Sequence, residues 1–286
     1  HEVGFFWGAH VVHHQSEEYN LSVALRQSWF QNLISFFLFM PIPILGFAPE
    51  VILGVGAFHT LYQFWIHTKA IGKLGPLEWI LNTPSHHRVH HAVNPKYIDK
   101  NHAGFLIIWD RLFGTFQEEE EEATFGITKP LQSWNPIWAN YHFYEEMVQQ
   151  AKNIPDWKNK LKLIVAPPGW VPDGVSSIYD QKPSFTKKYQ TPQSIGTQLY
   201  ILIQFLIILG GSIQYLRMFS KLEALYQVYF ALLILFSMMI CSAIMENKPW
   251  AIAAEYARLA LGAITIPVFY YYCYADWFTF VAVLCS

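Results

Sequence analysis

Two pentapeptides, His10-Val11-Val12-His13-His14 and His87-Arg88-Val89-His90-His91, share the spacing H-x-x-H-H. On a helix, positions i, i+3 and i+4 fall within an arc of about 100°, so each pentapeptide predicts a short helix whose three imidazoles face one point. Two copies among only 12 histidines are hard to explain by packing, because unpaired imidazoles are costly to bury. The two triplets therefore predict a shared metal centre.

The composition around these triplets is that of a membrane protein. Of 286 residues, 53% are hydrophobic and 14% are charged, against about 25% charged in soluble domains. We therefore expect an all-α integral membrane protein. The net charge of -2 leaves no broad cationic surface, which argues against nucleic acid as a partner.

Uncharged stretches predict where the chain meets the membrane. Residues 33–66 are interrupted only by Glu50 and predict a membrane hairpin of two helices joined near Pro49. A C-terminal region, 197–286, is expected to hold three transmembrane helices at about 197–216, 224–245 and 259–275. Residues 117–196 are expected to form a polar cytosolic segment, and the acidic run Glu118–Glu122 a solvated loop.

The hairpin also predicts where the metal centre lies. Both triplets must be on one side of the membrane to build one site, and a hairpin between them satisfies this condition. The site would then face the cytosol at the interface, where a lipid tail can stay in the bilayer. Six or more imidazoles exceed the four positions of a tetrahedral zinc site and so predict two metals. Iron is favoured because a redox metal can act on apolar substrates, although the sequence itself does not choose the metal.

His1 needs a separate explanation. In one unbroken helix, His1 would lie half a turn away from His10, so we expect a break at Gly4 or Gly8. We also expect a partner for His1 one turn before the start of this sequence. Glu2 is interpreted either as a solvated carboxylate or as an acceptor that orients an imidazole.

The remaining histidines divide by position. His67 ends the apolar hairpin twenty residues before His87 and is predicted to be a further metal ligand. His59 lies deeper in the apolar run, where a structural or channel-lining role is expected. His86 is a candidate for an outer contact to the site, whereas His102 and His142 have no helical partner and are expected to be ordinary surface or core residues.

These histidine boxes resemble those of the fatty acid hydroxylase superfamily of integral-membrane di-iron enzymes, whose pattern is H-x-x-x-H, H-x-x-H-H and a later H-x-x-H-H. His1 matches the second histidine of the first box. The resemblance covers residues 1–116, a di-iron domain incomplete at its N-terminus that includes the hairpin. It implies that Glu2 is the family's acidic neighbour and that the metal ligands are His1, His10, His13, His14, His67, His87, His90 and His91.

Within this superfamily, the stretches Asn82–His91, Ile98–Asn101 and Phe113–Phe116 are most similar to a branch of ether-lipid enzymes. That resemblance implies a multi-pass monooxygenase of the endoplasmic reticulum that uses two Fe ions, O2 and tetrahydrobiopterin. Its substrate would be an alkylglycerol or lyso-ether lipid, which is hydroxylated at the ether-linked carbon and cleaved to a fatty aldehyde and a glycerol derivative.

Two alternatives remain open. A sterol desaturase, a sterol methyl oxidase or a fatty acid hydroxylase would share the boxes but take electrons from cytochrome b5. A non-catalytic membrane metal-binding protein or transporter would use the histidines as transit ligands.

Overall fold

The computed structural model describes residues 1–178 and 188–273. In these ranges the regular structure is helical, and β-pairing is limited to two isolated antiparallel bridges, Leu81 with Leu106 and Ala92 with Phe125. The all-α expectation is therefore confirmed for the described residues. The chain forms two compact units, 1–132 with 137–189 and 133–136 with 190–286, and each unit is described by itself.

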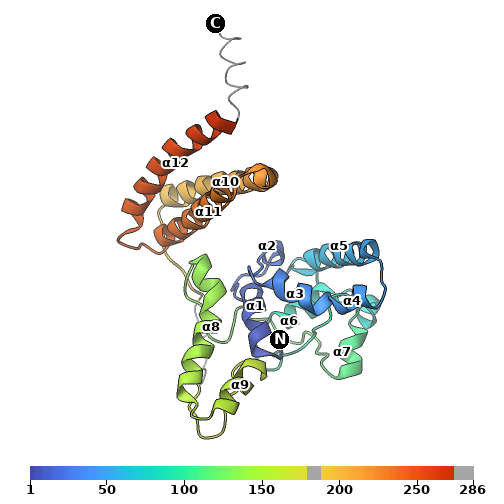
Figure 1. The fold of residues 1–286 in the computed structure, drawn as a ribbon. Helices are drawn as coiled ribbons and strands as arrows, with labels where there is room; N and C mark the ends of the chain where they lie inside the picture. The colour runs from blue at the N-terminus through green and yellow to red at the C-terminus, as the bar shows by residue number, and fades with distance from the viewer. Residues whose placement is uncertain (179–187, 274–286) are drawn as a thin grey trace. The chain divides into compact units, whose positions relative to one another are not determined.

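The first unit is built from helices of 4 to 18 residues joined by loops (Figure 1). It includes most of the segment 117–196 that was expected to be separate from the di-iron domain. Its helices are α1 (Gly4–His14), α2 (Leu21–Ala24), α3 (Gln31–Phe39), α4 (Pro41–Ile44), α5 (Pro49–Ile66), the 3-10 helix η1 (Gly75–Trp79), α6 (Pro84–His90), α7 (Ile108–Phe113), α8 (Pro136–Asn153) and α9 (Trp157–Val165).

Helix α1 approaches its neighbours closely because it has glycine where they meet. A Cβ atom on Gly8 would lie 2.6 Å from the ring of Tyr144 in α8, and one on Gly4 would lie 3.2 Å from the carbonyl oxygen of Leu163 in α9. Val11 of α1 also packs with Phe143 of α8. These contacts cover the face of α1 that lies away from His13, and His13 and His14 are themselves buried, 6% and 4% exposed.

The predicted hairpin at 33–66 is present as three helices rather than two. The first arm is divided at Met40, where α3 ends and α4 begins with a proline at its first turn, and the second arm starts at Pro49 as expected. Together, α3 and α4 cover 14 residues, Gln31–Ile44, which is about 21 Å of helix against a hydrocarbon core of about 30 Å. Length therefore favours a hairpin that enters the membrane without two full crossings.

The second unit consists of three long helices and a short turn (Figure 1): α10 (Ile195–Met218), the 3-10 helix η2 (Phe219–Lys221), α11 (Ala224–Met245) and α12 (Ala251–Cys273). Two helical stretches, Ile195–Lys221 and Ala224–Met245, are long and apolar enough to cross a membrane. They coincide with the first two predicted spans.

The third predicted span, 259–275, falls in α12, but this helix begins eight residues earlier than expected. Its first turns carry the charged residues Glu255 and Arg258, and it does not pass the same test of length and hydropathy. Residues 274 and 275 lie outside the described part of the chain.

Candidate metal centre

The eight histidines predicted as ligands gather into two groups of four. In the first cluster, each residue offers one ring nitrogen that lies within 4.8 Å of those of the others, and the same holds in the second cluster. The first cluster consists of His1, His10, His14 and His90. The second cluster consists of His13, His67, His87 and His91.

The grouping differs from the expectation that each triplet faces one point. His10 and His14, four residues apart on α1, join the first cluster, whereas His13 joins the second. Helix α6 does the reverse, because His87 and His91 join the second cluster and His90 the first. The physical reason is that residues i and i+4 are only 40° apart around a helix, while i+3 lies 60° to the other side of i. Each triplet therefore bridges both clusters.

The outer nitrogens of four of these rings are held by oxygen acceptors. Nδ1 of His13 lies 3.2 Å from the carbonyl oxygen of Arg26, Nδ1 of His67 lies 2.6 Å from that of Gln63, and Nδ1 of His90 lies 3.3 Å from that of Lys100. Nδ1 of His10 lies 3.2 Å from Oε1 of Gln31. A ring that donates through Nδ1 keeps its lone pair on Nε2, which is the arrangement typical of metal-bound histidine.

The Nε2 atoms converge on one another. Nε2 of His67 lies 3.1 Å from Nε2 of His13 and 3.0 Å from that of His87, and the Nε2 atoms of His10 and His14 are 3.2 Å apart. Two nitrogens that bind one ion at about 2.1 Å stand about 3.0 to 3.4 Å apart in octahedral or tetrahedral geometry. The observed separations fit that spacing.

Burial keeps these rings neutral. It lowers the pKa of His10 to about 4, and burial, followed by repulsion from His10 and His67, lowers the pKa of His13 to about 3. Burial likewise lowers the pKa of His67 to about 4. His13 and His67 both lie with Nδ1 against a carbonyl oxygen, so neutral rings that donate there turn two Nε2 lone pairs toward each other, an arrangement that a bound cation stabilises. The donor set therefore fits two metal ions, with imidazole as the ligand type.

His1 reaches the first cluster because α1 does not extend to it. The helix begins at Gly4, after Val3 in an extended conformation (φ -122°, ψ 116°). The His1 ring lies 4.9 Å from that of His10 and 4.7 Å from those of His14 and His90. Of the two break points expected from the sequence, the structure has the one at Gly4.

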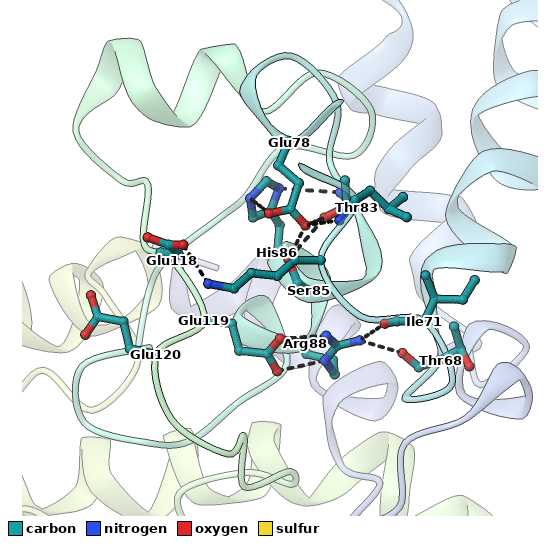
Figure 2. Close-up of polar contacts among 12 residues, drawn as sticks. Thr68, Ile71, Glu78, Thr83, Ser85, His86, Arg88, Glu118, Glu119 and Glu120 are labelled. Carbon is teal, nitrogen blue, oxygen red and sulfur yellow. Dashed lines mark hydrogen bonds and ion pairs between the residues drawn. The ribbon is translucent and has the colours of Figure 1, made fainter. Parts of the chain in front are cut away.

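A carboxylate network holds the start of α6, the helix that carries the second triplet (Figure 2). Oε1 of Glu78 accepts hydrogen bonds from the hydroxyls of Thr83 (2.9 Å) and Ser85 (2.7 Å). His86 lies on the same side, with Nε2 3.9 Å from Oε2 of Glu78. His86 therefore contacts the carboxylate that fixes α6 and belongs to neither four-histidine cluster.

Arg88 ties α6 to the segment that follows His67 (Figure 2). Its guanidinium donates to the carbonyl oxygens of Thr68 (3.0 Å) and Ile71 (2.8 Å) and makes two hydrogen bonds to Glu119, of 2.7 and 2.6 Å. The two carbonyl hydrogen bonds tie α6 to the chain that follows His67, and the bidentate pair with Glu119 holds the guanidinium in that position.

The acidic run Glu118–Glu122 is consequently more than the solvated loop expected from the sequence. Glu118, Glu120 and Glu121 are exposed, as expected, but pair with lysines at 2.6 to 3.5 Å, and the Glu119 side chain is only 17% exposed against Arg88. The sequence pattern did not indicate this, because the partner Arg88 lies 31 positions away.

His102 was expected to be an ordinary residue, yet it lies at the edge of the first cluster. Its ring is 5.3 Å from that of His1 and 6.0 Å from that of His90. Asp110 holds its backbone, accepting a hydrogen bond of 2.8 Å from the His102 N–H. The Nε2 atom is buried and has no hydrogen-bond partner among the described residues. No spacing signal could have identified it, since tertiary folding alone brings it to the site.

The other histidines lie apart from the clusters. His142 is buried on α8, where Nδ1 lies 3.4 Å from Nε2 of Gln15, which agrees with a core role. His59 is exposed on α5 and lies against Gly104.

Two cavities meet at His1. One, of about 510 Å³, is lined by Glu2, His102 and the α7 side chains Trp109 and Phe113. The other is lined by Trp7, His14, His90, Asp99 and Thr128. Glu2 is exposed at the wall of the larger cavity. Because His1 lines both cavities, both give access to the first cluster.

The chain is similar in sequence to several known proteins. Human alkylglycerol monooxygenase is 40% identical over 266 residues, which is 90% of this chain and 59% of the human protein. The Danio rerio alkylglycerol monooxygenase is 44% identical over 214 residues, covering 73% of this chain and 48% of that protein. Ornithine lipid hydroxylase OlsE of Rhizobium tropici is 31% identical over 117 residues, covering 41% of this chain and 35% of its own.

The chain thus spans about three fifths of the human relative that it matches. No solved structure matches it. The family model for fatty acid hydroxylase matches residues 1–115, the region that holds all eight clustered histidines. Residues 1–115 are therefore similar to the fatty acid hydroxylase family.

Proposed function

We propose that this chain is the major part of an alkylglycerol monooxygenase, which hydroxylates the ether-linked carbon of a lipid. The observation that carries the proposal is the pair of four-histidine clusters beside a cavity with polar and apolar walls. The similarity to alkylglycerol monooxygenases over about 90% of the chain supports the choice of substrate.

The eight clustered histidines would hold two iron ions. Iron held by these residues would supply the activation of O2 that attack on an unactivated C–H bond requires, and tetrahydrobiopterin would supply the two electrons. Insertion of one oxygen atom at the ether-linked carbon gives a hemiacetal, and the other atom leaves as water. The hemiacetal then separates into a fatty aldehyde and a glycerol derivative.

The larger cavity is suited to an alkylglycerol. Trp109 and Phe113 give it an apolar wall, and both are exposed on α7, 53% and 74%, where an alkyl chain can reach them from the bilayer. Glu2 and His102 line the same cavity beside His1. We propose that the alkyl chain lies on the α7 side and that these polar groups face the glycerol end.

The smaller cavity is the candidate pterin site. Trp7 offers an aromatic face, and Asp99 and Thr128 offer acceptors to the donor-rich edge of a flat heterocycle. His14 and His90 line the same cavity, so a reductant bound there would be adjacent to the first cluster.

The two candidate spans in the second unit and the apolar hairpin favour a multi-pass protein. We propose the endoplasmic reticulum membrane as its location, with the metal centre on the cytosolic side. Protease protection in sealed microsomes tests the orientation, because a cytosolic loop containing Glu118–Glu122 would be cleaved without detergent.

The decisive assay uses the full-length protein in membranes. An alkylglycerol with tetrahydrobiopterin should be converted to fatty aldehyde, whereas a sterol or a ceramide with NADH and cytochrome b5 should not react. Turnover that depends on cytochrome b5 and not on the pterin would overturn the proposal in favour of a sterol-type or acyl-type hydroxylase. Iron analysis of the same preparation distinguishes either kind of enzyme from a non-catalytic metal carrier. For such a carrier, bound zinc without turnover is expected.

A further inference from the structure

The second unit buries a charged pair inside its three-helix bundle. Arg258 and Glu255 of α12 are 8% and 5% exposed. The Arg258 guanidinium donates to both carboxylate oxygens of Glu255, at 2.7 and 2.5 Å, and to Oε1 of Gln204 in α10 at 2.6 Å. Tyr200 of α10 donates to the same carboxylate. Ionisable groups among apolar helices are costly and are generally found where the protein has a function for them.

The pair lies well inside the bundle. Gln204 is nine residues after the start of α10, Ser237 is eight residues before the end of α11, and Arg258 is seven residues after the start of α12. These offsets correspond to about 10 to 14 Å of helix from the end that the three helices share. The hydrogen bond from Gln193, just before α10, to the carbonyl oxygen of Met245 at the end of α11 marks that common end.

One donor of the guanidinium is left over. Nε and Nη2 direct their hydrogens at Glu255 and Gln204, but Nη1 makes a single long hydrogen bond, 3.4 Å, to the hydroxyl of Ser237. Since Nη1 carries two hydrogens, one has no partner among the described residues. Arg258 and Ser237 both line a cavity of about 170 Å³.

The cavity extends from this donor between apolar side chains toward the other end of the bundle. Its lining runs along α10 from Ile207 to Met218 and includes Phe230 of α11. The eleven steps from Ile207 to Met218 cover about 16 Å of helix. A polar donor at one end of a long apolar cavity is the arrangement that an amphiphilic chain requires.

We propose that this cavity binds a single-chain lipid with an uncharged oxygen head group, such as a long-chain alcohol. The head oxygen accepts the free hydrogen of Arg258 Nη1, and the alkyl chain lies along α10 and α11 toward Met218. An uncharged head is favoured because Glu255 already neutralises Arg258, so an anionic head would leave a net negative charge inside the bundle. This site is formed by residues of the second unit alone, and the proposal does not depend on the proposed reaction.

The test uses the full chain in detergent micelles and hexadecanol with a photoreactive diazirine in its chain. After irradiation, mass spectrometry should locate the label on peptides of α10, α11 and α12 that line the cavity. Unlabelled hexadecanol should compete about tenfold better than hexadecane, the gain expected from one hydrogen bond to a charged donor. Hexadecanoate should compete no better than hexadecane.

Two glycines provide matched variants. Gly211 lines the cavity and Gly210 does not, and a Cβ atom on either would meet nothing within 4 Å. Gly211→Leu should therefore fold, fill the cavity and reduce labelling at least fivefold, while Gly210→Leu should label as the unmodified chain does. Arg258→Lys retains the charge opposite Glu255 but removes the Nη1 donor, and it should reduce the preference for hexadecanol over hexadecane to less than twofold.

Several results would overturn the proposal. Full labelling of Gly211→Leu would mean that the cavity is not the binding site. Label spread evenly over the lipid-facing surface would indicate the surrounding detergent rather than a site. Stronger competition by hexadecanoate would exclude the uncharged head group.

Discussion

Eight imidazoles in the first unit gather ring nitrogens into two clusters of four, whereas Arg258 and Glu255 in the second unit neutralise each other directly. Both arrangements bury polar groups in apolar surroundings, but only in the second does the protein itself supply the group of opposite charge. The difference shows what each unit can bind. A cluster of lone pairs requires cations, while a neutralised pair with one spare donor suits an uncharged acceptor.

The largest effect should come from removing one imidazole of the first cluster. His90→Ala is expected to lower metal content and to reduce turnover by at least about 100-fold, because loss of even an outer partner of a metal ligand costs 10- to 100-fold. Metal per folded chain and initial rate are the measurements. His142→Ala removes a buried imidazole outside both clusters and should keep its metal. If both variants retained full metal content, the two-cluster interpretation would be wrong.

The next effect concerns the neutralised pair. Arg258→Met leaves the Glu255 carboxylate buried without its partner and should lower the free energy of unfolding of the second unit by about 3 to 5 kcal/mol. The double variant Glu255→Gln with Arg258→Met removes both charges and should recover most of that loss. Thermal unfolding of the solubilised chain measures the stability of the single and the double variant. If the double variant were no more stable than Arg258→Met, charge neutralisation would not be what stabilises the packing of these helices.

A smaller effect on stability is expected from the ion pair between Arg88 of α6 and Glu119 of the acidic run. Glu119→Gln weakens two charge-assisted hydrogen bonds to Arg88 and should destabilise the first unit by about 2 kcal/mol. Glu120→Gln is the matched control, because its pair with Lys96 is exposed, 58% and 37%, and should change stability by less than about 0.5 kcal/mol. Chemical denaturation of the two variants under identical conditions compares them, and equal losses would argue against a specific role for the Arg88 pair.

The smallest effect contrasts one glycine from each unit. Gly8→Ala places a methyl group 2.6 Å from the Tyr144 ring and should cost about 1 kcal/mol, the low end for overpacking, since Tyr144 is only half-buried and can shift. Gly210→Ala in α10 meets open space and should instead stabilise its helix by about 0.5 kcal/mol or slightly more. Midpoints of thermal unfolding distinguish the two signs. A stabilising Gly8→Ala would mean that α1 and α8 are not closely packed there.

The sequence alone could identify the six histidines of the two triplets and the first two long apolar helices, whereas His67 was predicted from its place after the hairpin and His1 from the family resemblance. Both signals are local. The H-x-x-H-H spacing depends on helix geometry over five residues, and an apolar span is a continuous stretch of composition. The number of metals followed from the number of imidazoles, because ligand counts do not depend on where the ligands lie.

Only the tertiary structure determined how these residues are shared. The division of each triplet between two clusters depends on how α1 and α6 face each other. His102 and Glu119 lie in loops, and the residues that they contact, His1 and Arg88, are far away in sequence. The pairing of Arg258 with Gln204 likewise depends on the packing of α12 against α10. Residue type and spacing set which chemistry is available, whereas long-range packing decides which atoms meet, since it brings together positions that no local pattern relates.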